Sequence, residues 1–198
     1  MAAIIAVLFG PERDPTKDRY VRGADVTSTR RLGRALAGDG IEIGGIRIPR
    51  MLEAQHFLFV GAPGSGKSTA IRRILRQVEA RGETAVVLDP ECEYVPEFYH
   101  LGRGDLILNP LDARCPAWSP WWELKPGSEA MEAEALVVRG RKRGLCAVLG
   151  FQAITQLRAI YGHEQTATLA AAPATKLILR TGEAETARWS SAQVEERE

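Results

Sequence analysis

The sequence is poor in cysteine, and the few it has exclude two kinds of small protein. There are three in 198 residues, Cys92, Cys115 and Cys146, and no two form a C-x-x-C pair. An odd number of widely spaced cysteines argues against a disulfide framework and against a zinc site. A reducing environment is the simplest interpretation, so we expect a cytoplasmic location.

Net charge and long apolar runs are also scarce. The formal net charge is +1, so any attraction to nucleic acid must come from a local basic surface. The apolar run at residues 2–9 is far shorter than the roughly 20 residues that a membrane-spanning helix needs. It also lacks the basic flank of a signal peptide. Either it packs on the body as a strand or helix, or it is the end of a membrane anchor whose beginning is absent.

One stretch carries a specific chemical pattern. Residues 61–69 read GAPGSGKST and fit the phosphate-binding pattern G-x-x-x-x-G-K-[ST]. Glycines allow the backbone to approach phosphate oxygens closely, and successive N–H groups then point at the ligand. Lys67 is expected to reach the β- and γ-phosphates and Ser68 to bind Mg²⁺. The predicted nucleotide-binding residues are Gly61, Ala62, Pro63, Gly64, Ser65, Gly66, Lys67, Ser68 and Thr69.

The neighbours of this stretch predict a βαβ unit. A short apolar run at residues 55–60 leads into the glycines, and apolar residues at helical spacing follow up to Gly82. Residues 84–90, TAVVLDP, are typical of a buried strand. This is the context that a phosphate-binding loop requires. The alternative is a glycine-rich turn with an exposed lysine.

The rest of the chain also favours an α/β protein. Asp25 or Thr27 could cap a helix that runs to about Leu36. The other expected elements are a hairpin at 41–48, a helix at 130–138, a strand at 145–151, helices at 154–162 and 165–172, a strand at 175–181 and a helix in the tail from 183. We expect an N-terminal segment, residues 1–50, and a nucleotide-binding core, residues 51–198.

Asp89 follows the predicted strand and has two interpretations. ATPases with this loop usually hold their metal through an acidic residue at the end of a neighbouring strand, so Asp89 is a candidate Mg²⁺ residue together with Ser68. The alternative is a residue that caps the Asp-Pro turn. No apolar run in this chain ends in the Asp-Glu pair that hydrolysis would favour.

Several segments in a fixed order resemble one family. They include YVRGADVTS, IGGIRIP, HFLFVGAPGSGKST, AVVLDPECEYVPEFY, ILNPLDARCPAWSPWWEL, GRKRGLCAVLGFQAITQLRAIYG and ETARWSSAQV. Over residues 19–195 the chain is similar to the cytoplasmic ATPase portion of type IV coupling proteins, the TraD/TrwB-type DNA-transfer motors of conjugation. The segments after the glycine loop are the more diagnostic ones, because many unrelated enzymes share the loop.

The resemblance implies a RecA-like P-loop ATPase core, with a mainly parallel sheet flanked by helices, that uses ATP and Mg²⁺. It implies a hexamer, anchored at the cytoplasmic face of the inner membrane, that moves single-stranded DNA from the relaxosome towards a secretion channel. By motif position Lys67 is a catalytic residue and Gln152 senses the γ-phosphate. Arg141, in GRKRG, is placed to act on the nucleotide of a neighbouring subunit, although a solvated basic turn explains that stretch equally well.

The departures from the family matter for activity. Its members carry two transmembrane helices before this region, an all-helical insertion, and then a Walker B strand that ends in Asp-Glu. Here the insertion and that strand are missing, with a deletion seam near residues 123–138. We therefore expect ATP binding with doubtful hydrolysis. Deleting a strand from a parallel sheet also predicts marginal stability or self-association.

Two other functions stay open from the sequence. A standalone P-loop NTPase or kinase would need Glu91, Glu93 or Asp105 as its catalytic acid. A non-enzymatic DNA- or partner-binding remnant would use the basic stretch at residues 139–143. It would also use the basic residues Arg30, Arg31 and Arg34.

Overall fold

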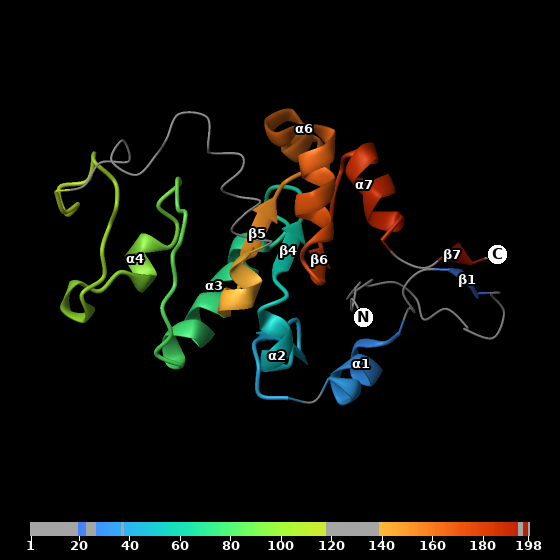
Figure 1. Cartoon of the computed structure of the whole chain (residues 1–198), viewed down its shortest axis with the longest axis horizontal. Coiled ribbons are helices and arrows are strands. Elements are labelled where there is room, and N and C mark those ends of the chain that lie inside the picture. Colours follow the sequence, from blue (N-terminus) through green and yellow to red (C-terminus); the bar gives the residue numbers. More distant parts are fainter. Residues whose placement is uncertain (1–19, 23–26, 37, 118–138, 194–195, 198) are drawn as a thin grey trace. The chain divides into compact units, whose positions relative to one another are not determined.

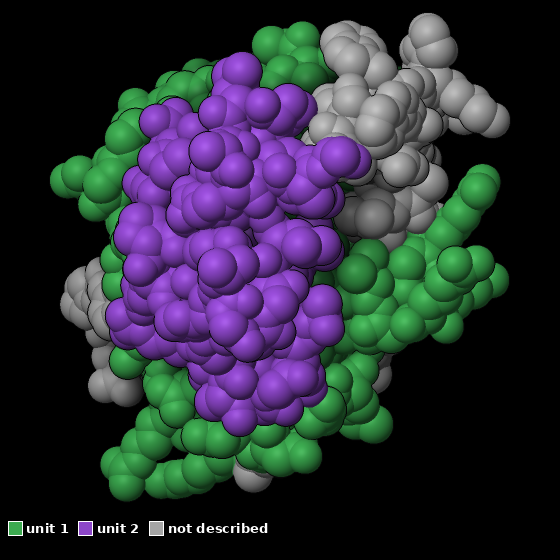
Figure 2. Space-filling model, turned by 90° about the vertical axis from the view of Figure 1, so that its left-hand side faces the viewer, with its two compact units in different colours: residues 1–74, 134–198 green, residues 75–133 purple. Residues whose placement is uncertain are grey.

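A computed structural model describes residues 20–22, 27–36, 38–117, 139–193 and 196–197. The chain forms two compact units, one of residues 1–74 and 134–198 and the other of residues 75–133 (Figure 2). The first unit holds the parallel sheet and the glycine loop. Three predictions lie outside the described residues: the apolar run at 2–9, the helix at 130–138 and the seam at 123–138.

A three-stranded parallel sheet forms the centre of the first unit (Figure 1). Strand β4 (Phe57–Val60) lies between β5 (Val148–Phe151) and β6 (Thr175–Ile178). Phe57 is level with Val148 on one side and with Thr175 on the other. All four residues of β4 are at most 1% exposed. An uninterrupted apolar run is what a parallel strand covered on both faces requires. The α/β fold class with a parallel sheet and flanking helices is confirmed.

Helices α3 (Lys67–Ala80), α6 (Ile154–Ala171) and α7 (Ala184–Ser191) accompany this sheet. Leu58 and Val60 of β4 form a buried cluster with Ile154, Leu157 and Ala170 of α6, and Trp189 of α7 packs against it. On α3, Ile71 Cδ1 lies 3.6 Å from where a Cβ of Gly150 would be. Among the described helices, none is long and apolar enough to cross a membrane.

The two helices predicted after β5 meet at Gly162. Its backbone angles, φ 74° and ψ 178°, are not helical and divide α6 into two helical stretches. The boundary matches the prediction of separate helices at residues 154–162 and 165–172.

The N-terminal region confirms the predicted hairpin and changes the predicted cap. Helix α1 (Thr29–Ala35) begins after Ser28, whose side chain accepts a hydrogen bond from Arg31 N at 3.3 Å. Neither Asp25 nor Thr27 is the cap, because Ser28 is the residue that directly precedes the first turn. The remaining elements of this unit are β1 (Tyr20–Arg22), β2 (Glu42–Ile43), β3 (Ile46–Arg47), α2 (Arg50–Glu53), η3 (Arg141–Arg143) and β7 (Glu196–Arg197).

The strand predicted at residues 84–90 is wrong. This segment has no strand, and Val86 and Leu88 are 98% and 91% exposed. The predicted βαβ unit would place this strand beside β4, but both sides of β4 are bonded to β5 and β6. The second strand of the predicted βαβ unit is therefore supplied by residues much later in the chain.

The second unit contains α4 (Val95–Phe98) and η1 (Leu101–Arg103). Among its ion pairs, Arg103 bonds Glu79 at 2.5 Å and Asp105 at 2.6 Å. The hydrogen bond from Arg103, aided by the backbone N–H of His100, lowers the pKa of Asp105 to about 2.

Candidate functional site

The glycine loop, residues 61–69, connects β4 directly to α3. Gly61 N donates to Phe151 O at 3.2 Å, and Ala62 N donates to Arg180 O at 2.9 Å. These two bonds tie the start of the loop to the ends of β5 and β6. The loop therefore lies at the carboxyl ends of all three parallel strands, where open α/β sheets bind their ligands.

Gly64 and Gly66 give the loop its shape. Their φ angles are 70° and 100°, values that residues with a side chain rarely adopt. No atom lies within 4 Å of where their Cβ atoms would be, so the need for glycine here is one of backbone conformation. The chain then enters α3 at Lys67, and Ala70 N donates to Gly66 O at 3.0 Å.

Lys67 turns its amine back over the loop. Its Nζ donates to Gly61 O at 2.5 Å and to Ala62 O at 3.2 Å. Partial burial disfavours the charged form and lowers the pKa of Lys67 below its usual value. A protonated amine so placed is available to a phosphate oxygen above the same loop.

The hydroxyls of the loop differ in their surroundings. Ser65 Oγ is buried and has no hydrogen-bond partner among the described atoms. Ser68, in the first turn of α3, is half-buried, and Thr69 is exposed. Backbone donors at a helix N-terminus, a lysine and an adjacent serine hydroxyl are the donor set that fits a phosphate with its metal ion. The residues present therefore fit a nucleotide phosphate.

Gln152 lies beside the loop. It follows β5 directly, and the preceding carbonyl, Phe151 O, is the one that Gly61 N contacts. Its own N–H donates to Gln156 Oε1 at 3.4 Å, and its side chain is exposed. The structure thus brings Gln152 and the glycine loop to the same edge of the sheet.

Arg141 lies elsewhere. Arg141, Lys142 and Arg143 form the exposed turn η3, which ends at Gly144 before the chain enters β5 at its amino end. The glycine loop is at the carboxyl ends of the strands, so η3 and the loop do not meet along the sheet. Any action of Arg141 on a nucleotide in a neighbouring subunit stays a prediction.

The carboxylate of Asp89 caps a turn. It accepts hydrogen bonds from Glu93 N at 2.8 Å, Tyr94 N at 2.8 Å and Val95 N at 3.1 Å. Both oxygens are used, and the bonded N–H groups lead into the first turn of α4. These are the contacts that the capping interpretation requires. A role of Asp89 at Mg²⁺ stays a prediction.

Asp105, one of the acids proposed for a standalone enzyme, is held by neighbouring residues of its own segment. Asp105 is bonded to Arg103 and to the backbone of His100. Within the described ranges, no three His, Cys, Asp or Glu side chains lie close enough together to hold a metal ion.

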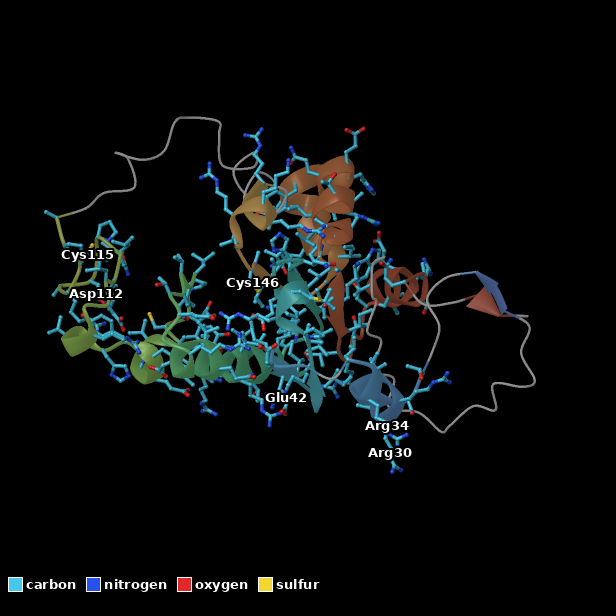
Figure 3. All side chains as sticks on the ribbon, turned by 60° about the horizontal axis from the view of Figure 1, so that its bottom comes forward. Arg30, Arg34, Glu42, Asp112, Cys115 and Cys146 are labelled. Atoms are coloured by element: carbon cyan, nitrogen blue, oxygen red, sulfur yellow. The ribbon has the colours of Figure 1, made fainter. Side chains whose placement is uncertain are left out.

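The basic residues of α1 form a surface of their own. Arg30 and Arg34 are exposed and one helical turn apart, and both point away from the body of α1 (Figure 3). Residues at this spacing share one face of a helix. This small basic face is available to an anionic partner.

Sequence reasoning missed two contributions to the site. The carbonyl of Arg180 anchors Ala62, and Thr186 holds the first residue of α6, just after Gln152. Arg180 lies near the end of the strand predicted at residues 175–181. Since the ends of parallel strands meet at one edge of a sheet, its contact with the glycine loop could have been anticipated. No local pattern marks Thr186, because its contact spans 32 residues.

Alanine at Gly61 and alanine at Gly64 are expected to perturb the loop for different reasons, the first by a steric clash and the second by backbone strain alone. A Cβ at Gly61 would lie 2.7 Å from both Leu179 Cβ and Ser65 Oγ, so the loop must shift against β6. We expect Gly61→Ala to cost about 1–3 kcal/mol of unfolding free energy and to weaken nucleotide binding. Gly64→Ala meets no atom and costs about 1–2 kcal/mol through its backbone angle.

Thermal unfolding and nucleotide titration of both variants would check this expectation. Gly64→Ala serves as the comparison, since it adds the same methyl group to the loop with backbone strain but no steric contact. Equal loss of nucleotide binding in the two variants would contradict a steric role for the contact with Leu179.

Comparison with known proteins identifies the family. The family model described as "Type IV secretion-system coupling protein DNA-binding domain" matches residues 40–140 and 130–198, well over half of the chain. The chain belongs to this family. Over 96 residues it is 43% identical to the coupling protein TraD of Escherichia coli (strain K12). The matched region covers 46% of this chain and 13% of TraD. The predicted resemblance is confirmed.

Solved structures of a coupling protein are also similar. The plasmid coupling protein TrwB in complex with ADP and Mg²⁺ is 29% identical, with a TM-score of 0.49, covering 64% of this chain and 30% of that one. The trigonal form of TrwBdeltaN70 in complex with sulphate is 30% identical, with a TM-score of 0.47, covering 61% and 29%. The chain thus spans less than a third of the length of these coupling proteins.

Proposed function

We propose that this chain is the ATP-binding part of a conjugative coupling protein, which binds ATP with Mg²⁺ through the glycine loop. The observation that carries the proposal is the geometry of the loop itself. It is bonded to the ends of β5 and β6, has left-handed glycines at Gly64 and Gly66, and ends at Lys67 in the first turn of α3. This arrangement directs backbone N–H groups and one ammonium group at a phosphate.

We propose further that the chain hydrolyses ATP weakly or not at all. Hydrolysis needs a carboxylate near the metal and a group that polarises water. Of the strands at the sheet edge, β5 is followed by Gln152, β6 by Leu179 and β4 by Gly61, so none supplies an acid there. Removing one group that stabilises a transition state typically costs about 10²–10³ in rate.

The chain is proposed to join two parts that lie apart in intact coupling proteins. Support comes from the family model, which matches in two stretches that meet at residues 130–140. The seam expected from the sequence, near residues 123–138, overlaps that meeting point. An internal deletion there accounts for the loss of the helical insertion and the Asp-Glu strand.

The partners belong to the intact protein. We propose that single-stranded DNA, the relaxosome and the secretion channel are its partners, and that it works as a hexamer at the cytoplasmic face of the inner membrane. Its membrane association is assigned to an anchor of the intact protein, not to any described helix. The family's description as a DNA-binding domain supports DNA as a partner.

The experiment that tests the proposal measures binding and turnover separately. Calorimetric titration of the purified chain with a non-hydrolysable ATP analogue, with and without Mg²⁺, is expected to show saturable, Mg²⁺-enhanced binding. Steady-state phosphate release is expected to stay at background. Absence of binding would refute the proposal, and turnover that disappears in Asp89→Ala would show that Asp89 supplies the missing acid.

DNA binding is the second candidate function. It is favoured by the exposed cations of η3 and of α1, and by the family description. Contacts between such residues and phosphates release counterions, so affinity falls steeply with salt. Titration of a fluorescent single-stranded oligonucleotide at two salt concentrations tests this candidate, and no binding at low salt would remove it.

A further inference from the structure

The first turns of α6 and α7 are joined by one buried hydroxyl. Thr186, in the first turn of α7, is fully buried, and its Oγ1 accepts a hydrogen bond from Ile154 N at 2.9 Å. Ile154 is the first residue of α6 and is itself 1% exposed. The N–H groups of a first helical turn have no partner within the helix, so an acceptor from α7 satisfies one of them.

Glu183 orients this hydroxyl. It is the N-cap of α7, and its carboxylate accepts hydrogen bonds from both the N–H and the hydroxyl of Thr186. The hydroxyl bond of Thr186 is the main cause that lowers the pKa of Glu183, with a further hydrogen bond from Thr155. A hydroxyl that gives its only hydrogen to Glu183 presents its lone pairs elsewhere, and here they face Ile154 N.

The residue held in this way lies close to Gln152. Ile154 comes two residues after Gln152, and Phe151 immediately before Gln152 is bonded to Gly61 of the glycine loop. The backbone of Gln152 is therefore fixed on one side by the loop and on the other by Thr186. Thr181, shortly after β6, accepts a hydrogen bond through its Oγ1 from Glu183 N at 3.3 Å, and so links the same turn to the end of β6.

We propose that Thr186, oriented by Glu183, is a positioning residue that sets Gln152 at the γ-phosphate end of the nucleotide site. The inference rests on the proposed function, because it assigns Gln152 the task of distinguishing ATP from ADP. A glutamine that contacts only the third phosphate contributes to binding of the triphosphate and not of the diphosphate. Its backbone must be held in place for that contact to form.

Thr186→Val tests this inference, because valine keeps the shape of threonine and removes the hydroxyl. Affinities for a non-hydrolysable ATP analogue and for ADP, both with Mg²⁺, are measured by calorimetry. We expect Thr186→Val to weaken binding of the analogue about tenfold and to change ADP affinity less than about twofold. Thr186→Ser, which keeps the hydroxyl, is expected to retain the ratio of ATP-analogue affinity to ADP affinity that the unaltered chain shows.

The double variant shows whether Thr186 acts through Gln152. Gln152→Ala is expected to give a similar loss for the analogue, and Thr186→Val/Gln152→Ala no further loss. Thr168→Val is the matched control, since it removes an exposed hydroxyl of α6 that donates to Glu164 O. If Thr186→Val does not fold, Glu183→Gln is measured in its place. This change at the helix cap perturbs the same hydroxyl and should lower the ratio of ATP-analogue affinity to ADP affinity.

The outcomes separate the two proposals. If the unaltered chain binds neither nucleotide, the proposed function fails and the inference fails with it. If the unaltered chain binds both nucleotides, but Thr186→Val weakens both equally or neither, the proposed function stands and Thr186 has only a structural role. Equal affinity of the unaltered chain for the two nucleotides would likewise overturn a sensing role for Gln152.

Discussion

Lys67→Met is expected to weaken ATP binding by about two orders of magnitude. The amine of Lys67 lies over the loop, within hydrogen-bond distance of the carbonyls of Gly61 and Ala62. Hydrogen bonds that involve a charged group contribute about 1.5–3 kcal/mol each, and a bound triphosphate offers this amine two phosphate groups. Methionine retains the aliphatic length of the side chain, so the loop itself is expected to stay folded.

Calorimetric titration with a non-hydrolysable ATP analogue and Mg²⁺ would measure this loss. Arg73→Met is the matched control, because Arg73 is an exposed cation on the same helix α3 and lies beyond the loop. Its affinity is expected to match that of the unaltered chain. Retained binding in Lys67→Met, with a normal unfolding temperature, would show that the glycine loop is not the nucleotide site.

The lowered pKa of Lys67 provides a second, independent test of this prediction. Burial lowers that pKa, so the lysine of the free protein loses its proton below the usual value for lysine. Only the protonated amine donates to phosphate with full charge. ATP affinity is therefore expected to fall as the pH rises through the pKa of the free lysine, and Lys67→Met should lack this alkaline decline.

Elements coded by a local pattern were predicted well from the sequence. The glycine loop joins β4 to α3 as expected, because glycines and a helical repeat in adjacent residues suffice to specify a strand, a turn and a helix. The hairpin at Gly44-Gly45 and the helix α7 follow from equally local signals. Gln152, which was assigned by motif position, directly follows the strand β5 that was predicted at residues 145–151.

What failed depends on contacts that are distant in the sequence. Residues 84–90 have the composition of a strand. Composition alone, however, does not determine which strands pair with the two sides of β4. Those sides are taken by β5 and β6, which lie far along the chain. The hydrogen bond between Thr186 and Ile154 is of the same kind: each residue is ordinary in its own segment, and only the fold brings them together.

Exposed apolar residues of the second unit and the open edges of the parallel sheet predict that the chain self-associates. Among the described residues of the second unit, six apolar side chains are more than half exposed: Val86, Leu88, Leu101, Leu106, Leu108 and Leu111. In the described sheet, β5 and β6 are also edge strands, each with one side that β4 does not use. Exposed apolar segments with strand composition and open sheet edges are the two features that promote pairing between chains.

Replacing two of these side chains by lysine should therefore shift the chain towards the monomer. Burying one such side chain contributes about 1.5–3 kcal/mol, so Val86→Lys/Leu88→Lys is expected to weaken self-association at least about tenfold. Sedimentation velocity over a range of protein concentrations measures the change. Met51→Lys is the control, because Met51 is 81% exposed on α2, outside these segments. A monomer at every concentration, or an equal effect of Met51→Lys, would show that residues 84–111 are not the associating surface.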